Sequence, residues 1–498
     1  MTKLTLLELR SPPLQFGGAA HTSDPKAGLE AAGPFDIRFG SARKETINLG
    51  VIGPPALADD ARRWIDRVSA GIPVLSASTA LRRPFPPFET VFRKSLIHTD
   101  FMTVALEGEA DPIELALAHA DPFDRFQAVV DLYGEALDRL SRRDVNRPDL
   151  VLLCLPDAVV EKCRTVERNS TEDERERAKA IRKSKASRQG DFFDVLDEIE
   201  EGADDLLKRD LRQALKARAL AARLPIQLVT SRLLYDSVKG EDPATRAWNF
   251  SVGIYYKAGG IPWRLTPPGP DTCFVGVTFH HFHTRQRHVV QSSLAQAFSS
   301  EGEGFAIRGT GVPVTPGQRL NVHLSEEQAF DLGARILSEY LLRTGRSPLR
   351  LVIHKTSHFD DAEVRGFGSA LADVPIVSLV TLVPSAVRLI RFSQYPPKVG
   401  TVFSLNGSRT YLYTSGFIPE IDTYPGPHIP QPFEVRSLGP EDSMISATDV
   451  FNLTRMNWNT ADVRGKWPVT LSFARRVGGI LNEYGDQDPE ETSFRYFV

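Results

Sequence analysis

Cysteine is scarce in this sequence, with only Cys154, Cys163 and Cys273 among 498 residues. A disulfide framework needs several cysteine pairs, and a cysteine-rich zinc site needs closely spaced ones, so both are excluded and a reducing compartment is indicated. Long apolar runs are also missing, since no run approaches the ~20 residues of a membrane-spanning helix. The start, MTKLTLLELRSPP, lacks the pattern of a signal peptide. We therefore expect a cytoplasmic protein with no membrane partner.

A charge excess of either sign is absent as well. The 60 Lys and Arg residues nearly balance the 63 Asp and Glu residues, which leaves a net charge of −3. The overall charge therefore predicts no nucleic-acid binding, and a polyanion site would have to be a local basic patch. At roughly 150 residues per domain, the chain is long enough for two or three domains.

The first half of the chain predicts an α/β fold. Residues 1–40 are rich in Gly, Pro and Ala and predict an extended segment. After them, the short apolar run TINLGVIGPP precedes the helical pattern ALADDARRWIDRVSAGI, and the helical pattern DRFQAVVDLYGEALDRLSRR precedes the wholly apolar strand LVLLCL. Such alternation favours a parallel sheet covered by helices. Residues 164–210 are dense in mixed charge and predict a solvated, partly helical insertion.

The second half begins a new α/β unit. CFVGVTFHHF and LRLVIHKT are predicted strands, and the helical pattern SEEQAFDLGARILSEYLLRT lies between them, where Ser325 and Gln328 fit a capping box. A late helix in PVTLSFARRVGGILNEYG ends at a glycine. This order is compatible with a ribonuclease-H-like domain, although periodicity alone does not separate that fold from other α/β folds.

Four polar residues could converge on a phosphate. Arg212 and Lys216 are four residues apart on one predicted helix and share a face. Gln227 lies on the following strand, and Lys257 ends the next helix. Several cations and an amide donor are what a terminal phosphate needs. Taken singly, an exposed Arg or Lys on a helix is typical of solvated surface, and Lys257, near a helix C-terminus, is also consistent with a charge that offsets the helix dipole.

The surrounding segments LRQALKARALAARLPIQLVT and RAWNFSVGIYYKAGGIPWRL resemble the MID domain of prokaryotic Argonautes. In that family a basic or aromatic residue, a lysine four residues later, a glutamine and a lysine in a K-x-G-G-x-P-W segment hold the guide 5′-phosphate. Arg212, Lys216, Gln227 and Lys257 match this pattern. Many relatives carry Tyr at the position of Arg212. The resemblance implies a Rossmann-like MID domain over residues 41–260 that includes the charged insertion.

Residues 261–498 then resemble a PIWI domain, which has the ribonuclease H fold. Active members carry one Asp on the first strand and another in an I-H-[RK]-D-G strand, and together with further carboxylates these hold two Mg²⁺ ions. In FVGVTFHH and LVIHKTSHF the two positions are Thr278 and Thr356. Because Mg²⁺ favours anionic oxygens, the resemblance implies no catalytic residue and no target cleavage.

The length and the missing carboxylates resemble the short prokaryotic Argonautes, which consist of MID and inactive PIWI. The resemblance implies a small guide, usually RNA, and recognition of complementary single-stranded DNA. It also implies an APAZ-containing effector protein on another chain, either an NAD⁺-consuming sirtuin-type or TIR enzyme or a nuclease, which acts against plasmids or phages. In some Argonautes a Mg²⁺ ion at the guide phosphate is bound by the C-terminal carboxylate, here that of Val498.

Three other hypotheses remain open. A ribonuclease-H-like nuclease could use a displaced site, and a metalloprotein could use histidines. The chain could also scaffold an effector without any guide. The displaced nuclease site would use Asp271, Asp360 or Asp361, and Glu363. The histidine metal site would use His280, His281 and His283, with His354 or His358 as a further ligand. A basic surface that contacts a nucleic-acid backbone would comprise Arg285, Arg287 and His288.

Overall fold

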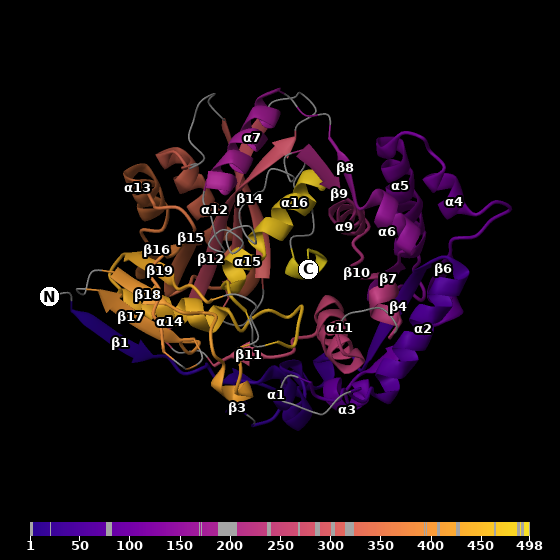
Figure 1. The fold of residues 1–498 in the computed structure, drawn as a ribbon, viewed down its shortest axis with the longest axis horizontal. Helices are drawn as coiled ribbons and strands as arrows, with labels where there is room; N and C mark the ends of the chain where they lie inside the picture. Colours follow the sequence, from indigo (N-terminus) through magenta and orange to yellow (C-terminus); the bar gives the residue numbers. More distant parts are fainter. Residues whose placement is uncertain are drawn as a thin grey trace.

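The structure is a computed structural model of the chain (Figure 1). It describes residues 3–19, 21–75, 82–168, 170, 172–187, 207–236, 241–266, 269–283, 289–299, 304–313, 323–392, 394, 396–405, 409–424, 429–462, 465–485, 489 and 493–497. Among the helices of these segments, none has both the length and the apolar character needed to cross a bilayer.

A parallel sheet forms the core of the first half. Its strands are β4 (Thr46–Gly53), β5 (Ser95–Ile97), β6 (Thr103–Ala105), β7 (Leu150–Cys154) and β10 (Ile226–Val229), in the order β10-β7-β4-β5 with β6 also on β4. Alternate residues of β7 face two separate apolar clusters, so both faces of the sheet are covered. The helices of this half are α2 (Pro55–Ala70), α3 (Phe88–Phe92), α4 (Pro112–Leu117), α5 (Pro122–Ser141), α6 (Asp157–Cys163), α9 (Leu211–Ala221), α10 (Ser231–Leu234) and α11 (Pro243–Lys257).

The charged insertion contains more regular structure than the sequence predicts. Its helix is α7 (Glu172–Ser187), and two short strands, β8 (Thr165–Glu167) and β9 (Lys208–Asp210), pair antiparallel at its base. β9 leads directly into α9, whose N-cap is Asp210. The base of the insertion is therefore joined to the helix that carries Arg212 and Lys216.

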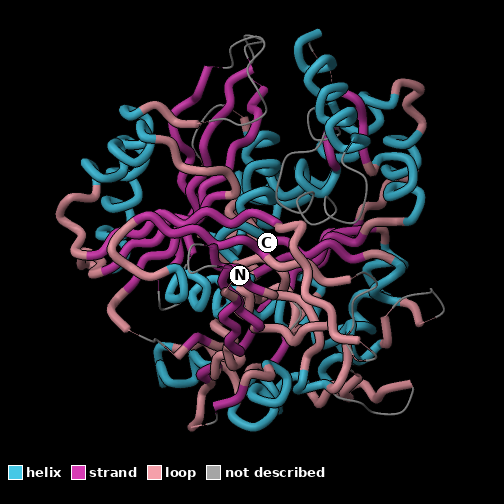
Figure 2. Tube along the Cα trace, turned by 60° about the vertical axis from the view of Figure 1, so that its left-hand side comes forward, coloured by secondary structure: helices cyan, strands magenta, loops and turns pink. Residues whose placement is uncertain are grey.

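A nine-stranded sheet forms the core of the second half, with helices outside it (Figures 1 and 2). β12 (Thr272–His283), β13 (Val289–Ser299) and β14 (Gly304–Pro313) are antiparallel, and β15 (Arg350–Lys355) and β16 (Ile376–Pro384) run parallel to β12. The order β14-β13-β12-β15-β16 is that of a ribonuclease-H-like fold. The sheet continues with β19 (Phe433–Leu438), β18 (Arg409–Leu412) and β17 (Thr401–Leu405). The helices are α12 (Glu326–Thr344), α13 (Asp361–Ala370), α14 (Ser443–Leu453), α15 (Val469–Ser472) and α16 (Ala474–Tyr484).

The N-terminal segment belongs to both halves. β1 (Leu4–Glu8) pairs with β17 as the outer strand of the nine-stranded sheet. β2 (Leu14–Gln15) pairs with β3 (His21–Thr22) and with β11 (Arg264–Leu265). The prediction of a wholly extended segment is wrong for α1 (Pro25–Ala32), because the Asp24 side chain caps this helix by accepting from two of its backbone amides. The capping box predicted at Ser325 and Gln328 is confirmed at the start of α12.

Candidate nucleic-acid interface

A cavity of about 650 Å³ lies at the carboxyl ends of β7 and β10, where α9 and α16 meet. Ligands of open α/β sheets bind at this end of the strands. α9 lines it on one side, α16 on another, and the segments that follow β7 and β10 complete the wall. The basic lining residues are Arg164, Arg212, Lys216, Arg232 and Arg476, and the acidic ones Asp157, Glu161 and Asp210.

Lys216 reaches this cavity from the middle of α9. Its side chain is buried, and its Nζ donates to the backbone carbonyl of Phe497 over 3.2 Å. Arg212, one turn earlier, is exposed at the cavity wall. The start of α9 is fixed by Asp210, whose carboxylate accepts from the backbone amide of Gln213. The two predicted cations of this helix therefore share one face, as their spacing predicts.

Gln227 and Lys257 are bonded to each other and are not among the residues that line the cavity. Lys257 ends α11 and is buried, and its Nζ donates to Oε1 of Gln227 over 2.5 Å. Nε2 of Gln227 donates to the backbone carbonyl of Leu228 over 3.1 Å. The structure therefore brings together the residues that the sequence pattern grouped. Arg212 and Lys216 line the cavity, and Arg212 acts electrostatically on Lys257, which binds Gln227.

The electrostatics of these lysines are unusual. Burial, together with the smaller effect of the neighbouring guanidinium groups of Arg212 and Arg476, lowers the pKa of Lys257 to about 7. Burial also lowers the pKa of Lys216 well below its ordinary value, with Arg212, Lys257 and Arg476 acting in the same direction. Every charged neighbour that shifts the two pKa values is a cation. An anion placed among them would remove this repulsion.

Arg476 is a functional candidate that the sequence did not reveal. It lies on α16, lines the cavity, and acts electrostatically on both lysines. Phe497 was missed as well, although its carbonyl accepts the bond from Lys216. Both residues are far from α9 in sequence, so local spacing could not group them with it. A basic residue on a late helix with a double glycine, FARRVGGIL, was the only available signal.

Thr278 and Thr356 lie side by side in the second half. The parallel register of β12 and β15 ends with Val277 opposite Lys355, so the next residue on each chain is one of these threonines. Thr278 is buried, and its Oγ1 lies 3.2 Å from Nε2 of His280. The positions where the resemblance expects carboxylates are thus adjacent, with neutral hydroxyls in their place.

The carboxylates of the displaced-site hypothesis are divided between two ends of the sheet. Asp271 precedes β12 and accepts from Tyr340 over 3.0 Å and from Arg346 over 2.8 Å. Asp360 and Glu363 follow the opposite end of β15. Because β12 and β15 are parallel and in register, Asp271 cannot meet Glu363. Asp361 is exposed at the start of α13.

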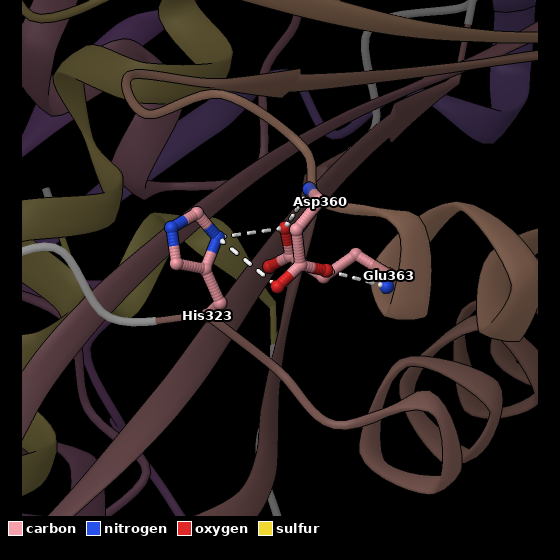
Figure 3. Close-up of side chains that lie close together, drawn as sticks. All are labelled: His323, Asp360 and Glu363. Atoms are coloured by element: carbon pink, nitrogen blue, oxygen red, sulfur yellow. Dashed lines mark hydrogen bonds and ion pairs between the residues drawn. The ribbon is translucent and has the colours of Figure 1, made fainter.

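Figure 3 shows the one group among the described residues that has the spacing of a metal site: His323, Asp360 and Glu363. Nδ1 of His323 lies 3.2 Å from Glu363 Oε2 and 3.8 Å from Asp360 Oδ2. The Glu363 carboxylate also accepts from Lys355 and from the backbone amides of two loop residues, Leu324 and Asp360. The lone pairs of the Glu363 carboxylate are therefore already used by these donors. We interpret His323, Asp360 and Glu363 as a helix cap with an ion-pair network.

The histidines do not converge on a metal site within the described part of the chain. His354 is fully buried, its Nδ1 lies 2.9 Å from Oγ1 of Thr470, and burial lowers its pKa to about 3, which keeps it neutral. His280 packs against α16, and His358 is exposed beside Arg436. The side chains of His281 and His283, and the whole of Arg285, Arg287, His288 and Val498, lie outside the described residues.

The fold matches Argonaute structures. Clostridium butyricum Argonaute, solved with a guide DNA and a 19-mer target DNA, aligns with a TM-score of 0.62 and 14% sequence identity over 98% of this chain and 54% of that one. Aa-Ago, solved with externally bound siRNA, aligns with a TM-score of 0.56 and 15% identity over 99% of this chain and 56% of that one. No protein-family model matches the sequence, and no curated protein sequence does. The chain spans about half the length of these Argonautes and has their MID and PIWI fold, as the sequence predicts.

Proposed function

We propose that this chain binds the 5′-phosphate of a small guide, an RNA, in the cavity between α9 and α16. The observation that carries this proposal is the pair of buried lysines, Lys216 and Lys257, whose pKa values are lowered by burial and by other cations. Buried cations are stable only when compensated, and a phosphate supplies both charge and several acceptor oxygens. Arg212 and Arg476 would complete the phosphate contacts.

The bound guide would select complementary single-stranded DNA. The Argonaute from Clostridium butyricum was solved with a guide and a target DNA, and this chain shares its fold. Because Thr278 and Thr356 replace carboxylates, the chain would hold the duplex without cutting it.

The response would come from a second protein. We propose an APAZ-containing effector, either an NAD⁺-consuming sirtuin-type or TIR enzyme or a nuclease, that is activated by the guide–target duplex in a prokaryotic defence system. The support is the resemblance of the sequence segments to MID and PIWI domains, together with the matching fold. The two hydroxyl residues at the PIWI carboxylate positions add to it, because recognition without cleavage needs an output elsewhere.

A Mg²⁺ ion at the guide phosphate would be held by the carboxylate of Val498, and it would supply charge neutralisation. The described residues next to Lys216 fit this ion poorly, because they are mainly cations. Asp210, the nearby acid on α9, is already engaged as the helix N-cap. The lysines and arginines therefore carry the phosphate binding in this proposal, and no step depends on a metal.

The guide proposal is tested by fluorescence anisotropy with one RNA in 5′-phosphorylated and 5′-hydroxyl forms. We expect the unmodified protein to prefer the phosphorylated RNA, and the double variant Lys216→Ala/Gln227→Ala to lose the preference. The control is Lys44→Ala, because the Lys44 side chain is 71% exposed, pairs with Asp149, and does not line the cavity. Equal affinity of the unmodified protein for the two RNAs, or an unchanged preference in the double variant, would refute the assignment.

The absence of cleavage has its own assay. The guide-loaded protein is incubated with labelled complementary DNA in Mg²⁺ and in Mn²⁺, and we expect intact target in both. A cut at a fixed distance from the guide end would restore the nuclease hypothesis. The partner is tested by co-expression with the neighbouring reading frames, followed by measurement of NAD⁺ loss or DNA damage on addition of target.

A further inference from the structure

Three residues of α16 share one face of the helix. Arg476, Ile480 and Glu483 are spaced by four and then three residues, which places them in one row. The first two line the cavity. The third is not among the lining residues, and its side chain is only 3% exposed. A carboxylate this buried is stable only when it is paired.

Two arginines at the base of the insertion, Arg168 and Arg209, bind this carboxylate. Nη2 of Arg168 lies 2.7 Å from Oε1 of Glu483. Nε and Nη2 of Arg209 lie 2.9 and 2.8 Å from Oε2. The fork of Arg209 thus binds one oxygen, and Arg168 binds the other, so both carboxylate oxygens are held.

The arginines are themselves fixed. Nε of Arg168 donates to the carbonyl of Lys208, across the β8–β9 pair. The Arg209 guanidinium lies 4.8 Å from the ring centroid of Phe126 on α5, and its Nη1 donates to Gln127 over 3.0 Å. Both guanidinium groups are therefore held in place by contacts other than the one with Glu483. We call Arg168 and Arg209 together the clamp on Glu483.

The clamp acts on the geometry of the cavity because β9 continues into α9. Arg209 is followed by the N-cap Asp210 and then by the helix that carries Lys216. α16 also packs closely on α9, since a Cβ on Gly479 would lie 2.4 Å from the Gln213 amide. Figure 1 shows α16 beside α9 and β9. The distance between the Arg476 and Lys216 backbones is therefore set by this contact between the two halves.

We propose that Glu483, held by Arg168 and Arg209, is a positioning residue that keeps α16 against α9 so that Arg476 and Lys216 bind one anion together. This proposal rests on the proposed function, because the anion is the 5′-phosphate of the guide. It extends that function by assigning a role to an acid and two arginines outside the cavity lining.

The test measures the ratio of the dissociation constants for 5′-hydroxyl and 5′-phosphorylated RNA. Glu483→Gln keeps the shape of the side chain and removes its charge, and we expect it to lower this ratio by roughly tenfold while the affinity for 5′-hydroxyl RNA stays unchanged. Arg209→Lys keeps the charge and loses the fork, and we expect the same direction of change. The control is Glu326→Gln, which breaks an exposed pair between Glu326 on α12 and Arg365 on α13.

The outcomes separate the two proposals. If the unmodified protein prefers phosphorylated RNA but Glu483→Gln and Arg209→Lys keep its full ratio, the positioning role is wrong even if their melting temperatures fall. If the unmodified protein shows no preference, the proposed function itself fails and the positioning role fails with it. Should Glu483→Gln not fold, the milder Arg209→Lys decides. A double-mutant cycle with both changes should be strongly non-additive, because they break one contact.

Discussion

Lys257 combines two properties that are rarely found together in one side chain, complete burial and a position among other cations. Its pKa of about 7 means that the amine of the free protein changes charge near neutral pH. A bound phosphate would favour the protonated amine, so binding and proton uptake are coupled. The pH dependence of guide binding therefore reports on the protonation of Lys257.

We expect the affinity for 5′-phosphorylated RNA to fall as the pH rises from 7 to 9, by up to about tenfold per pH unit, because binding must then protonate Lys257. Anisotropy titrations across this range measure the effect. The Lys257→Arg variant, which stays charged, should show a flatter profile, and 5′-hydroxyl RNA should show little change. A flat profile in the unmodified protein would contradict the role of Lys257.

The same residue should act on stability with the opposite sign. Because its pKa is lowered on folding, the unfolded chain binds the proton more tightly between about pH 7 and 10. The contribution of Lys257 to the free energy of unfolding therefore becomes more favourable as the pH rises through that window. Comparison of urea unfolding of the unmodified protein and Lys257→Met at pH 7 and 9 isolates this contribution, and the difference should shrink at pH 9.

Glu363 gives a second prediction for a single residue. It is fully buried and paired with Lys355, which is buried as well. We expect Glu363→Ala to lower the free energy of unfolding by about 3–5 kcal/mol, because it leaves the lysine unpaired in the interior. Asp361→Ala, at an exposed position two residues earlier, should change it by less than about 0.5 kcal/mol.

Thermal unfolding with added metal completes that test. Since the Glu363 carboxylate is saturated with hydrogen bonds, Mg²⁺, Mn²⁺ or Zn²⁺ should leave the melting temperature of the guide-free protein unchanged. A metal-dependent rise that disappears in Glu363→Ala would make the group in Figure 3 a genuine metal site.

At the scale of elements, α16 is fitted between the two halves by its double glycine. Gly479 faces α9, and Gly478 faces β12, where an added Cβ would lie 2.3 Å from the ring of His280. The histidine that seemed a metal-ligand candidate in the sequence is thus a packing partner of this helix. Its neighbour Thr278 occupies the same face of the strand.

We expect Gly478→Ala to destabilise the protein by about 1–3 kcal/mol, because the buried ring of His280 has little room to move. The matched control is Gly368→Ala on α13, where a Cβ would meet no atom within 4 Å. That change should instead stabilise by about 0.5–1 kcal/mol, through helix propensity alone. Differential scanning calorimetry of the two variants gives the comparison, and similar shifts in both would show that the close contact is absent.

The elements also show what the sequence could and could not predict. β4, β7 and α5 were recognisable because their apolar patterns are local, and the grouping of Lys216 with Lys257 followed from a family resemblance carried by short segments. The pairing of β1 with β17 and the approach of Arg476 to α9 join distant parts of the chain, and no local pattern encodes such contacts. The two threonines could be named from the sequence, but their adjacency required the register of β12 and β15.

At the scale of the whole molecule, the nine-stranded sheet ends at β1 with an apolar edge. Leu4, Leu6 and Leu7 are each about half exposed. Within the described residues β1 pairs only with β17, so its outer edge presents backbone groups together with these leucines. Exposed apolar edge strands tend to pair with other chains.

Leu6→Lys should therefore reduce self-association of the purified protein, measured by light scattering over time, and change the free energy of unfolding by less than about 0.5 kcal/mol. Leu75→Lys is the matched control, because Leu75 is 72% exposed but lies in a loop. If both variants reduce scattering equally, general surface hydrophobicity and not the strand edge is responsible.

The hydrogen bond from Lys216 to the carbonyl of Phe497 has a practical consequence for protein production. An affinity tag fused after residue 498 would begin two residues beyond Phe497, which lines the cavity, and it would compete with any ligand there. The opposite end of the chain begins near β1, at the outer edge of the large sheet (Figure 1). Purification handles, fluorophores and surface-immobilisation linkers therefore belong at the N-terminus, and binding data from C-terminal fusions would understate the affinity.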